Sequence, residues 1–248
     1  VPVVAYDRLI KNTEYVDYYI SFDNTLVGVQ IGEYIEEALD LKNASGKSYN
    51  IELFAGSPDD NNAHMLYDGA MSVLQQYIDN GSLDVVSGQT NFETVCTLRW
   101  DGALAQSRME NILTANYSSG KKIDAIFSSY DGLSRGIVEA LRSVGYGSAD
   151  HPWPIITGQD AETATIKSII AGEQTQTIFK DTRVLAAQAV KTVDALLKGE
   201  EVEVNDTETY ENGVKVVPSY LCTPISVDVN NYKEVLVDSG YVTESELK

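Results

Sequence analysis

Residues 154–183, PIITGQDAETATIKSIIAGEQTQTIFKDTR, constrain the fold more than any other stretch of the chain. Their apolar and turn residues predict a strand at 155–156, a turn at 158–160, a helix at 162–171 and a strand at 175–179. Asp160 and Lys180 then follow the ends of two strands. Because ligands of open α/β sheets bind beyond the carboxyl ends of the strands, these two charged groups are candidates for holding a small polar ligand.

Either charged residue alone has a structural explanation, since Asp after a strand also caps helices and forms turns. The same arrangement, however, recurs along the chain. Further strands are predicted at residues 1–5, 18–21, 50–54, 83–87, 123–127, 214–218 and 225–227. Helices are predicted at 26–39, 65–78, 103–115, 133–144, 183–198 and from about 231. Repeated βα units with short loops indicate an α/β protein of two doubly wound lobes with mostly parallel sheets.

Composition restricts the partners of the chain. The 248 residues carry a formal net charge of −19, with a pI near 4.3. This acidity disfavours nucleic acid and anionic membrane surfaces. A hydrophobic content of 43% without an apolar run near 18 residues indicates a soluble, globular receptor for neutral ligands.

Few residues are available for metal or cofactor chemistry. His64 and His151 are the two histidines. The sequence leaves open whether Cys96 and Cys222 form a disulfide, are two buried thiols, or are neither. No spacing typical of a zinc site or a phosphate-binding glycine loop occurs, so neither a metal nor a cofactor is expected.

An enzyme is also disfavoured. The serine hydrolase motif G-x-S-x-G is absent. A glycosidase could use Asp7 and Asp160 as its carboxyl pair. Arg8 and Lys180 beside them would keep both carboxylates ionised, which leaves no general acid.

The polar residues at the predicted strand ends share one chemistry. They are carboxylates, amides, cations and one indole: Asp7, Arg8, Asn61, Asn62, Arg99, Trp100, Asp131, Asp160 and Lys180. A sugar hydroxyl can accept a hydrogen bond from a cation or amide while it donates one to a carboxylate. An aromatic ring can cover the apolar face of a pyranose. The mixture therefore favours a monosaccharide site.

Several segments carry a family resemblance. They are VPVVAYDRLI, YYISFDN, ELFAGSPDDNNAHMLYDGAMSVL, LRWDGALAQSRMENIL, SSYDGLSRGI, ITGQDAETATIKSIIAGEQTQTIFKDTR, VNDTETYENGVKVVPSYL and YKEVLVDSGY. With these segments the chain resembles the periplasmic sugar-binding proteins of ABC transporters. It is most similar to the multiple-monosaccharide and xylose-binding branch of the type I periplasmic binding proteins.

The resemblance implies a role for each candidate residue. Asp7 and Arg8 would bind ring or anomeric oxygens, and Trp100 would stack on the sugar. Asn62, helped by Asn61, would come from the SPDDNN loop. The hydroxyl contacts would be completed by Asp131, Asp160 and Lys180. Asp59 and Asp60 are expected to be loop and cap residues instead.

The resemblance also implies an architecture and a biological role. Residues 1–23 and 181–223 would form one lobe, and residues 24–180 and 224–248 the other, with sugar bound in the interlobe cleft. The implied function is capture of an aldose such as glucose, galactose, xylose or arabinose and its delivery to an ABC transporter permease. The implied location is periplasmic, or extracellular and membrane-tethered as a lipoprotein.

Three further expectations concern alternatives. Relatives of this type carry two or three βα units before the strand at 1–5, so the first lobe is expected to be incomplete, and the chain alone to bind sugar poorly. A module that signals sugar to a membrane histidine kinase or chemoreceptor is a second possible function. A sugar-responsive repressor is disfavoured, because no basic DNA-binding segment is present.

Overall fold

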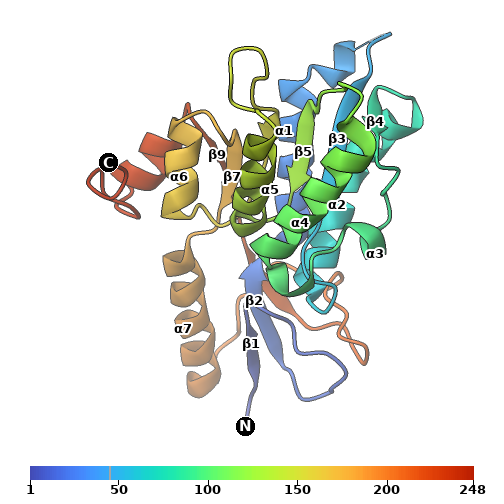
Figure 1. Ribbon diagram of the computed structural model, residues 1–248. Helices are drawn as coiled ribbons and strands as arrows, with labels where there is room; N and C mark the ends of the chain where they lie inside the picture. The colour runs from blue at the N-terminus through green and yellow to red at the C-terminus, as the bar shows by residue number, and fades with distance from the viewer. Residues whose placement is uncertain (45) are drawn as a thin grey trace. The chain divides into compact units, whose positions relative to one another are not determined.

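The computed structural model describes residues 1–44 and 46–248 (Figure 1). The chain divides into two compact units. Unit 1 comprises Val1–Asn24 and Lys180–Pro224, and unit 2 comprises Thr25–Phe179 and Ile225–Lys248. The polypeptide therefore passes from one unit to the other three times. That these units are the two lobes of a receptor stays a prediction.

Unit 1 is built on a parallel sheet in the order β1-β2-β8. Its elements are β1 (Val4–Tyr6), β2 (Tyr18–Phe22), α7 (Thr182–Lys198) and β8 (Ser219–Cys222). Ile20 and Phe22 of β2 pack with Leu185 of α7 and with Cys222 of β8. The small core of this unit thus joins its first two strands to segments nearly two hundred residues further along the chain.

Unit 2 contains a sheet in the order β4-β3-β5-β6, parallel throughout. Its strands are β3 (Tyr49–Phe54), β4 (Leu83–Val85), β5 (Ala125–Ser128), β6 (Ile155–Ile156), β7 (Gln176–Phe179) and β9 (Ile225–Asp228). Its helices, with Asn24 of unit 1 opening the first, are α1 (Asn24–Ala38), α2 (Asn61–Asp79), α3 (Phe92–Val95), α4 (Gly102–Ile112), α5 (Asp131–Ser143) and α6 (Thr163–Ile170).

Helices cover both faces of this sheet. Leu53 of β3 and Phe127 of β5 pack with α1 and α2 on one face. Their neighbours in the same strands, Phe54 and Ile126, pack with α4 and α5 on the other face, which lies to the front in Figure 1. Successive side chains of a strand point to opposite faces, so a strand between two helical layers is apolar at most of its positions.

The edge of the sheet beyond β6 continues irregularly. Thr175 N donates to Ile156 O (3.0 Å), and Ile178 N donates to Gly158 O (3.1 Å). The strand β7 therefore runs beside β6 and the turn that follows it. β7 then pairs with β9 in antiparallel register. The expected α/β fold with mostly parallel sheets is confirmed.

One predicted strand, at residues 214–218, is wrong. The strand is β8, which begins after Pro218. The buried Asn212 side chain accepts hydrogen bonds from Val214 N and Lys215 N, both at 3.0 Å, and donates to Thr13 O at 2.7 Å. These bonds hold residues 212–215 in a turn, although the residues themselves favour a strand.

Three other segments differ from expectation. The segment before and around Trp100, where no helix is predicted, contains α3 and a 3₁₀ turn, η2 (Leu98–Trp100). The helix predicted at 103–115 is α4, followed by a π-helical turn, η3 (Leu113–Tyr117). The C-terminal helical segment is also a π-helical turn, η4 (Lys233–Asp238). Among the described residues, no helix has the length and apolar character that crossing a membrane requires.

Two glycines allow α1 and α2 to cross with their backbones in contact. A Cβ at Gly28 would lie 1.9 Å from Leu66 O, and one at Gly69 would lie 2.2 Å from Thr25 O. Any side chain at either position would therefore push the helices apart.

We expect Gly28→Ala to lower the free energy of unfolding by about 1–3 kcal/mol, because the added methyl group overpacks the contact. Chemical denaturation measures the change. The matched control is Glu33→Ala on the exposed side of the same helix, which should stay within about 0.5 kcal/mol of the parent. Equal stability of the two variants would contradict this account of the helix contact.

Candidate functional site

The predicted residues of unit 2 follow the carboxyl ends of neighbouring parallel strands. Asn61 and Asn62 come after β3, Asp131 after β5 and Asp160 after β6. In a parallel sheet these ends meet at one edge. Trp100 reaches the same group of loops from η2, because its ring meets that of Tyr130 edge-on, with centroids 6.0 Å apart.

The indole of Trp100 is held in place from two sides. Its Nε1 donates to Asp60 Oδ2 (3.2 Å). The far end of the ring lies against the backbone of Gly56, where a Cβ would come within 2.0 Å of the indole. A half-buried ring fixed by a hydrogen bond and a glycine is preorganised to offer an aromatic face.

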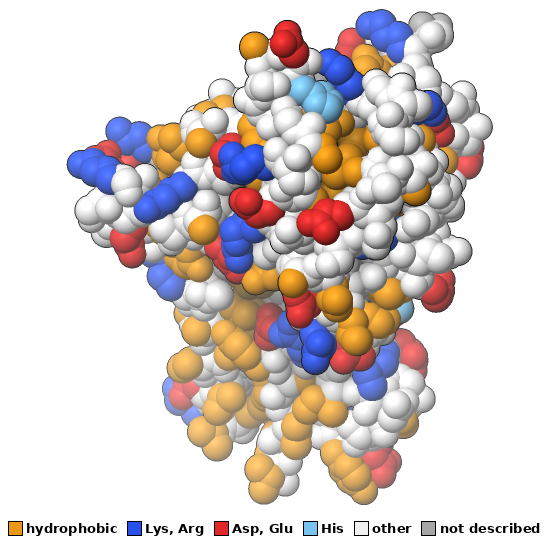
Figure 2. All heavy atoms as spheres, in the orientation of Figure 1, with side chains coloured by type: hydrophobic (Ala, Val, Ile, Leu, Met, Phe, Trp, Pro, Cys, Tyr) orange, Lys and Arg blue, Asp and Glu red, His pale blue; other side chains and the backbone are white. Residues whose placement is uncertain are grey.

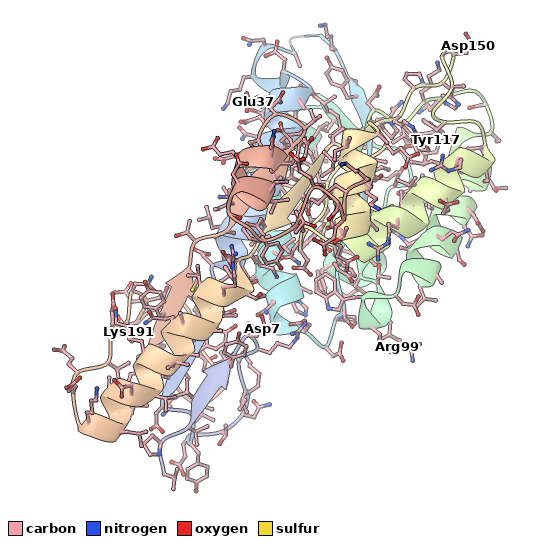
Figure 3. All side chains as sticks on the ribbon, turned by 90° about the vertical axis from the view of Figure 1, so that its left-hand side faces the viewer. Asp7, Glu37, Arg99, Tyr117, Asp150 and Lys191 are labelled. Carbon is pink, nitrogen blue, oxygen red and sulfur yellow. The ribbon has the colours of Figure 1, made fainter. Side chains whose placement is uncertain are left out.

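The backbone that carries Trp100 is strained. Arg99 and Trp100 both have left-handed conformations, with φ of 58° and 55°. Arg99 N donates to the Ser57 hydroxyl at 2.8 Å, which ties this turn to the loop after β3. Arg99 itself extends outward from the turn and is exposed (Figure 3). Left-handed non-glycine residues cost free energy and cluster at functional sites.

Asn61 and Asn62 form the first turn of α2, where Asp60 is the N-cap. Asp60 Oδ1 accepts from Asn62 N at 3.0 Å, so the expected capping role of Asp60 is found. The Asn61 amide lies 3.5 Å from Met65 Sδ. Both Asn side chains are half-buried beside the residue that anchors Trp100.

Asp131 is enclosed within unit 2, with no exposed surface. Its Oδ1 accepts from Gln174 Nε2 (3.1 Å) and Thr177 Oγ1 (2.9 Å). Its Oδ2 accepts from Glu162 N (3.0 Å). The carboxyl group thus holds the loop after β6 against β7. Its expected contact with a sugar hydroxyl stays a prediction.

Asp160 occupies the strained part of that loop. It has φ of 95°, and the following residue, Ala161, has φ of 49°. The turn is fixed by two bonds to β7, from Asp160 N to Ile178 O (2.8 Å) and from Ala161 N to Thr177 Oγ1 (3.2 Å). The backbone of Asp160 is therefore placed precisely, while its side chain is half-exposed.

In unit 1, Asp7 follows β1 and is also left-handed, with φ of 64° (Figure 3). Its carbonyl oxygen accepts from the hydroxyls of Tyr19 (2.8 Å) and Ser21 (3.0 Å), both buried. Its carboxylate forms an ion pair with Arg8. The two hydroxyls fix the backbone of Asp7, and the ion pair of Asp7 with Arg8 lies at the end of β1.

Lys180, the other predicted residue of unit 1, follows β7 and is half-exposed. The next residue, Asp181, caps α7 by accepting from Arg183 N (3.0 Å). The Arg183 guanidinium beside it lowers the pKa of Asp181. Lys180 is therefore placed between the end of a strand and a well-capped helix.

The residues that connect these loops were not predicted from the sequence. Tyr130 donates its hydroxyl to Glu162 Oε1 (2.6 Å), and Glu162 forms an ion pair with Arg135. Asp60 connects the loop after β3 to η2, because it accepts from Trp100 Nε1 in addition to its expected role as a cap. The only signal in the sequence was the position of these residues next to predicted site residues.

No metal site is found among the described residues, which contain no group of three His, Cys, Asp or Glu suited to hold an ion. Both cysteines lie in the described part of the chain and are free thiols. Cys222 is buried in unit 1, and Cys96 is half-buried in unit 2. The two cysteines are thus neither a disulfide nor two buried thiols.

Comparison with known proteins places this architecture in a family. A family profile described as a periplasmic binding protein domain matches residues 1–201. The chain belongs to the periplasmic binding protein family. The type I periplasmic-binding-protein fold expected from the resemblance is confirmed.

Two curated members of the periplasmic binding protein family are close in sequence. The multiple sugar-binding periplasmic protein SbpA of Azospirillum brasilense is 59% identical over 248 residues, which are all of this chain and 69% of SbpA. The D-xylose-binding periplasmic protein of Escherichia coli is 39% identical over 251 residues, which cover all of this chain and 68% of that protein. The resemblance to the multiple-monosaccharide and xylose-binding branch is confirmed.

A solved member of the family is similar in structure. It is an ABC transporter solute-binding protein from Clostridium phytofermentans with bound β-D-glucose. The two share 50% identity with a TM-score of 0.94, over all of this chain and 75% of that chain.

The buried Asp131 carboxyl group makes stability depend on pH. Burial raises its pKa to about 8, although the donated hydrogen bonds oppose the shift. The folded protein therefore keeps this proton at pH values where the unfolded chain has released it. The stabilisation is complete below about pH 4, the ordinary range of an Asp, and is lost as pH rises through about 8.

In the parent protein, the free energy of unfolding should decrease by about 1.4 kcal/mol per pH unit between pH 5 and 7. We expect this decrease to be absent in Asp131→Asn, because the amide cannot ionise. Urea denaturation at several pH values measures the slope. Asp84→Asn, at an exposed position of β4, is the matched control. If both variants keep the parent slope, Asp131 is not protonated in the folded protein.

Proposed function

We propose that the chain is a solute-binding receptor that captures a monosaccharide. One observation carries the proposal. Asp7, Trp100 and Asp160, each singled out from the sequence as a sugar contact, all have left-handed backbones. Each is fixed by hydrogen bonds from neighbouring residues or to them, so the strain is maintained by the surrounding structure.

The chemistry of these residues matches a sugar. Asp160 can accept hydrogen bonds from hydroxyl groups, and the Asn61 and Asn62 amides can both donate and accept. In unit 1, Arg8 and Lys180 can donate, and Asp7 can accept. The relatives support this assignment, since one is a multiple sugar-binding protein and a solved one holds β-D-glucose.

Trp100 supplies the apolar part of the interaction. A pyranose has C–H groups on its faces, and an aromatic ring covers them at little conformational cost. Because Asp60 and Gly56 already fix the indole, binding needs no reorganisation of this side chain. We therefore assign Trp100 as the stacking residue.

We further propose that the receptor works outside the cytoplasm and delivers its sugar to an ABC transporter permease. The curated relatives are named as periplasmic proteins, and the solved relative belongs to an ABC transporter. By their names these relatives bind sugars and are not enzymes. Attachment to a membrane as a lipoprotein stays a prediction from the sequence.

Calorimetric titration of the chain with glucose, galactose, xylose and arabinose tests the proposal. Weak but saturable binding of at least one aldose is expected. Trp100→Ala should weaken that binding by roughly thirtyfold, since it removes a buried aromatic contact of about 2 kcal/mol. The control is Trp153→Phe, at the other tryptophan, where affinity should not change. Absence of binding to every aldose would refute the proposal for this chain.

Asp60→Ala tests whether the anchor of Trp100 matters. We expect a loss of about 1 kcal/mol in stability, because the cap of α2 is removed. Sugar affinity should also fall, by roughly tenfold, because the indole loses its fixed orientation. Asp59→Ala changes the adjacent exposed carboxylate and should affect sugar affinity less. Equal affinities of the two variants would contradict the anchoring role.

A further inference from the structure

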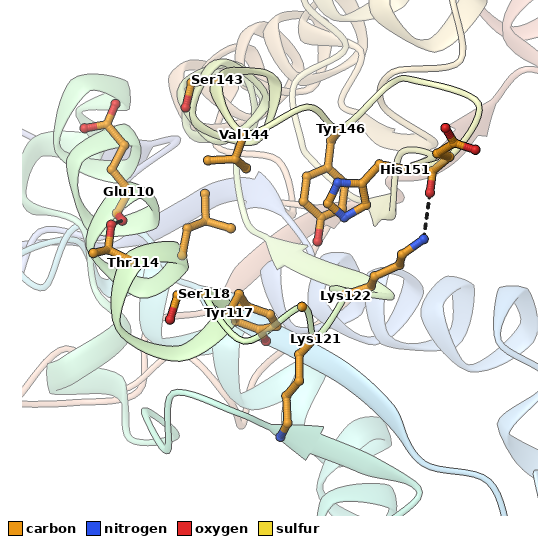
Figure 4. Close-up of a pocket in the computed structure, with 13 residues that line it drawn as sticks. Glu110, Thr114, Tyr117, Ser118, Lys121, Lys122, Ser143, Val144, Tyr146 and His151 are labelled. Atoms are coloured by element: carbon orange, nitrogen blue, oxygen red, sulfur yellow. Dashed lines mark hydrogen bonds between the residues drawn. The ribbon is translucent and has the colours of Figure 1, made fainter.

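A cavity of about 810 Å³ opens in unit 2, away from the residues assigned to sugar. It lies where η3 extends α4, beside the end of α5 and the start of β5 (Figure 4). Figure 2 shows a hollow with hydrophobic side chains on this face of the unit. Its volume is typical of a small-molecule site, and sites of that kind are mostly apolar with a few polar groups.

The π-helical turn η3 builds one wall of this cavity. Leu113, Thr114 and Tyr117 of the turn all line it. A π-turn inserts one extra residue into a helix and so redirects the side chains that follow. Such turns are rare and occur frequently at functional sites.

The wall on the other side is aromatic and rigid. Tyr146 stacks on His151, with ring centroids 3.7 Å apart. The Tyr146 hydroxyl accepts from Ile123 N (2.8 Å), which fixes the ring against the start of β5. Opposite it, Tyr117 donates its hydroxyl to the buried Glu52 (2.8 Å). Both hydroxyls are thus bonded within the protein, and Figure 4 shows these rings and Val144 around the cavity.

Val144 marks the mouth of the cavity. It follows the last residue of α5, lines the cavity and is 50% exposed. A half-exposed apolar side chain over an apolar floor is the surface that a ring-shaped ligand would cover.

Charged residues surround the apolar floor. Lys121 and Lys122 are consecutive cations on one side, in a chain with twice as many acidic as basic residues. Lys122 Nζ donates to Asp150 O (2.7 Å), which uses one of its three N–H groups (Figure 4). Glu110 and Asp150 also line the cavity. The Glu110 carboxylate accepts from Gln106 (2.9 Å), across the cavity from Lys122.

We propose that this cavity is a second ligand site, for a small aromatic carboxylate. The ring would pack on Leu113, Tyr117 and Tyr146 beneath Val144, and the carboxylate would accept from Lys122. The sugar residues of unit 2 follow the carboxyl ends of its strands, whereas this cavity adjoins the amino end of β5. The two ligands would therefore bind at opposite ends of the strands of one sheet, without competition.

Fluorine NMR of three matched probes tests the proposal: 4-fluorobenzoate, the neutral 4-fluorobenzamide and the cationic 4-fluorobenzylamine. Each is titrated with the whole chain at millimolar probe concentration. We expect saturable binding of 4-fluorobenzoate, weaker binding of the amide and weakest binding of the amine. Addition of D-glucose should leave the affinity for 4-fluorobenzoate unchanged.

Two pairs of variants locate the site. Val144→Asp should weaken 4-fluorobenzoate binding by about tenfold or more, because it places a carboxylate over the floor. Val190→Asp, at a 70% exposed position of α7, is its control. Lys122→Gln should weaken benzoate binding roughly threefold and leave benzamide binding unchanged. Lys215→Gln, in the turn before β8, is the control for that loss of charge.

Several results would overturn the proposal. One is the absence of saturable 4-fluorobenzoate binding to the parent chain. Another is undiminished binding to Val144→Asp, since a folded variant with a charged mouth cannot hold the ring. Tighter binding of the amine than of the benzoate would refute the assigned charge, and displacement by D-glucose would refute a separate site. Circular dichroism of each variant establishes that it is folded.

Discussion

The central strands of unit 2 are covered by helices on both faces, and this burial governs where polar chemistry can occur. Side chains such as Leu53, Phe54 and Phe127 must be apolar, because each points into a helical layer. Glu52 is a polar exception, and it needs Ser87 and Tyr117 as hydrogen-bond partners. Residues that bind a polar ligand are thereby restricted to the loops at the ends of the strands.

Those loops are held by buried polar groups, so that their strained residues keep one conformation. A single carboxylate, Asp60, both caps α2 and fixes Trp100. The buried Asp131 carboxyl group joins the loop after β6 to β7. Free energy gained in these buried bonds offsets the cost of the left-handed residues beside them. The conformation of the candidate site residues thus depends on hydrogen bonds made by other residues in these loops.

Much of the fold and the strand-end positions of the candidate site residues could be predicted, because strand patterns and the residues that follow them are local signals. The prediction of a strand at 214–218 was wrong, because the turn there depends on a hydrogen bond from Asn212 to Thr13, nearly two hundred residues earlier. The burial of Asp131 could not be predicted either, because it depends on Gln174 and Thr177, which are distant in the sequence. The π-turn η3 and the cavity beside it could not be predicted from the sequence, because apolar spacing does not distinguish a π-turn from a continuing α-helix.

The three passages of the chain between the units determine the order in which the protein can fold during synthesis. β1 and β2 are synthesised before β3 to β9. β2 pairs with β8, which is made only after all of β3 to β7. The core that joins β3 to β6 with their helices can therefore form before the pairing of β2 with β8.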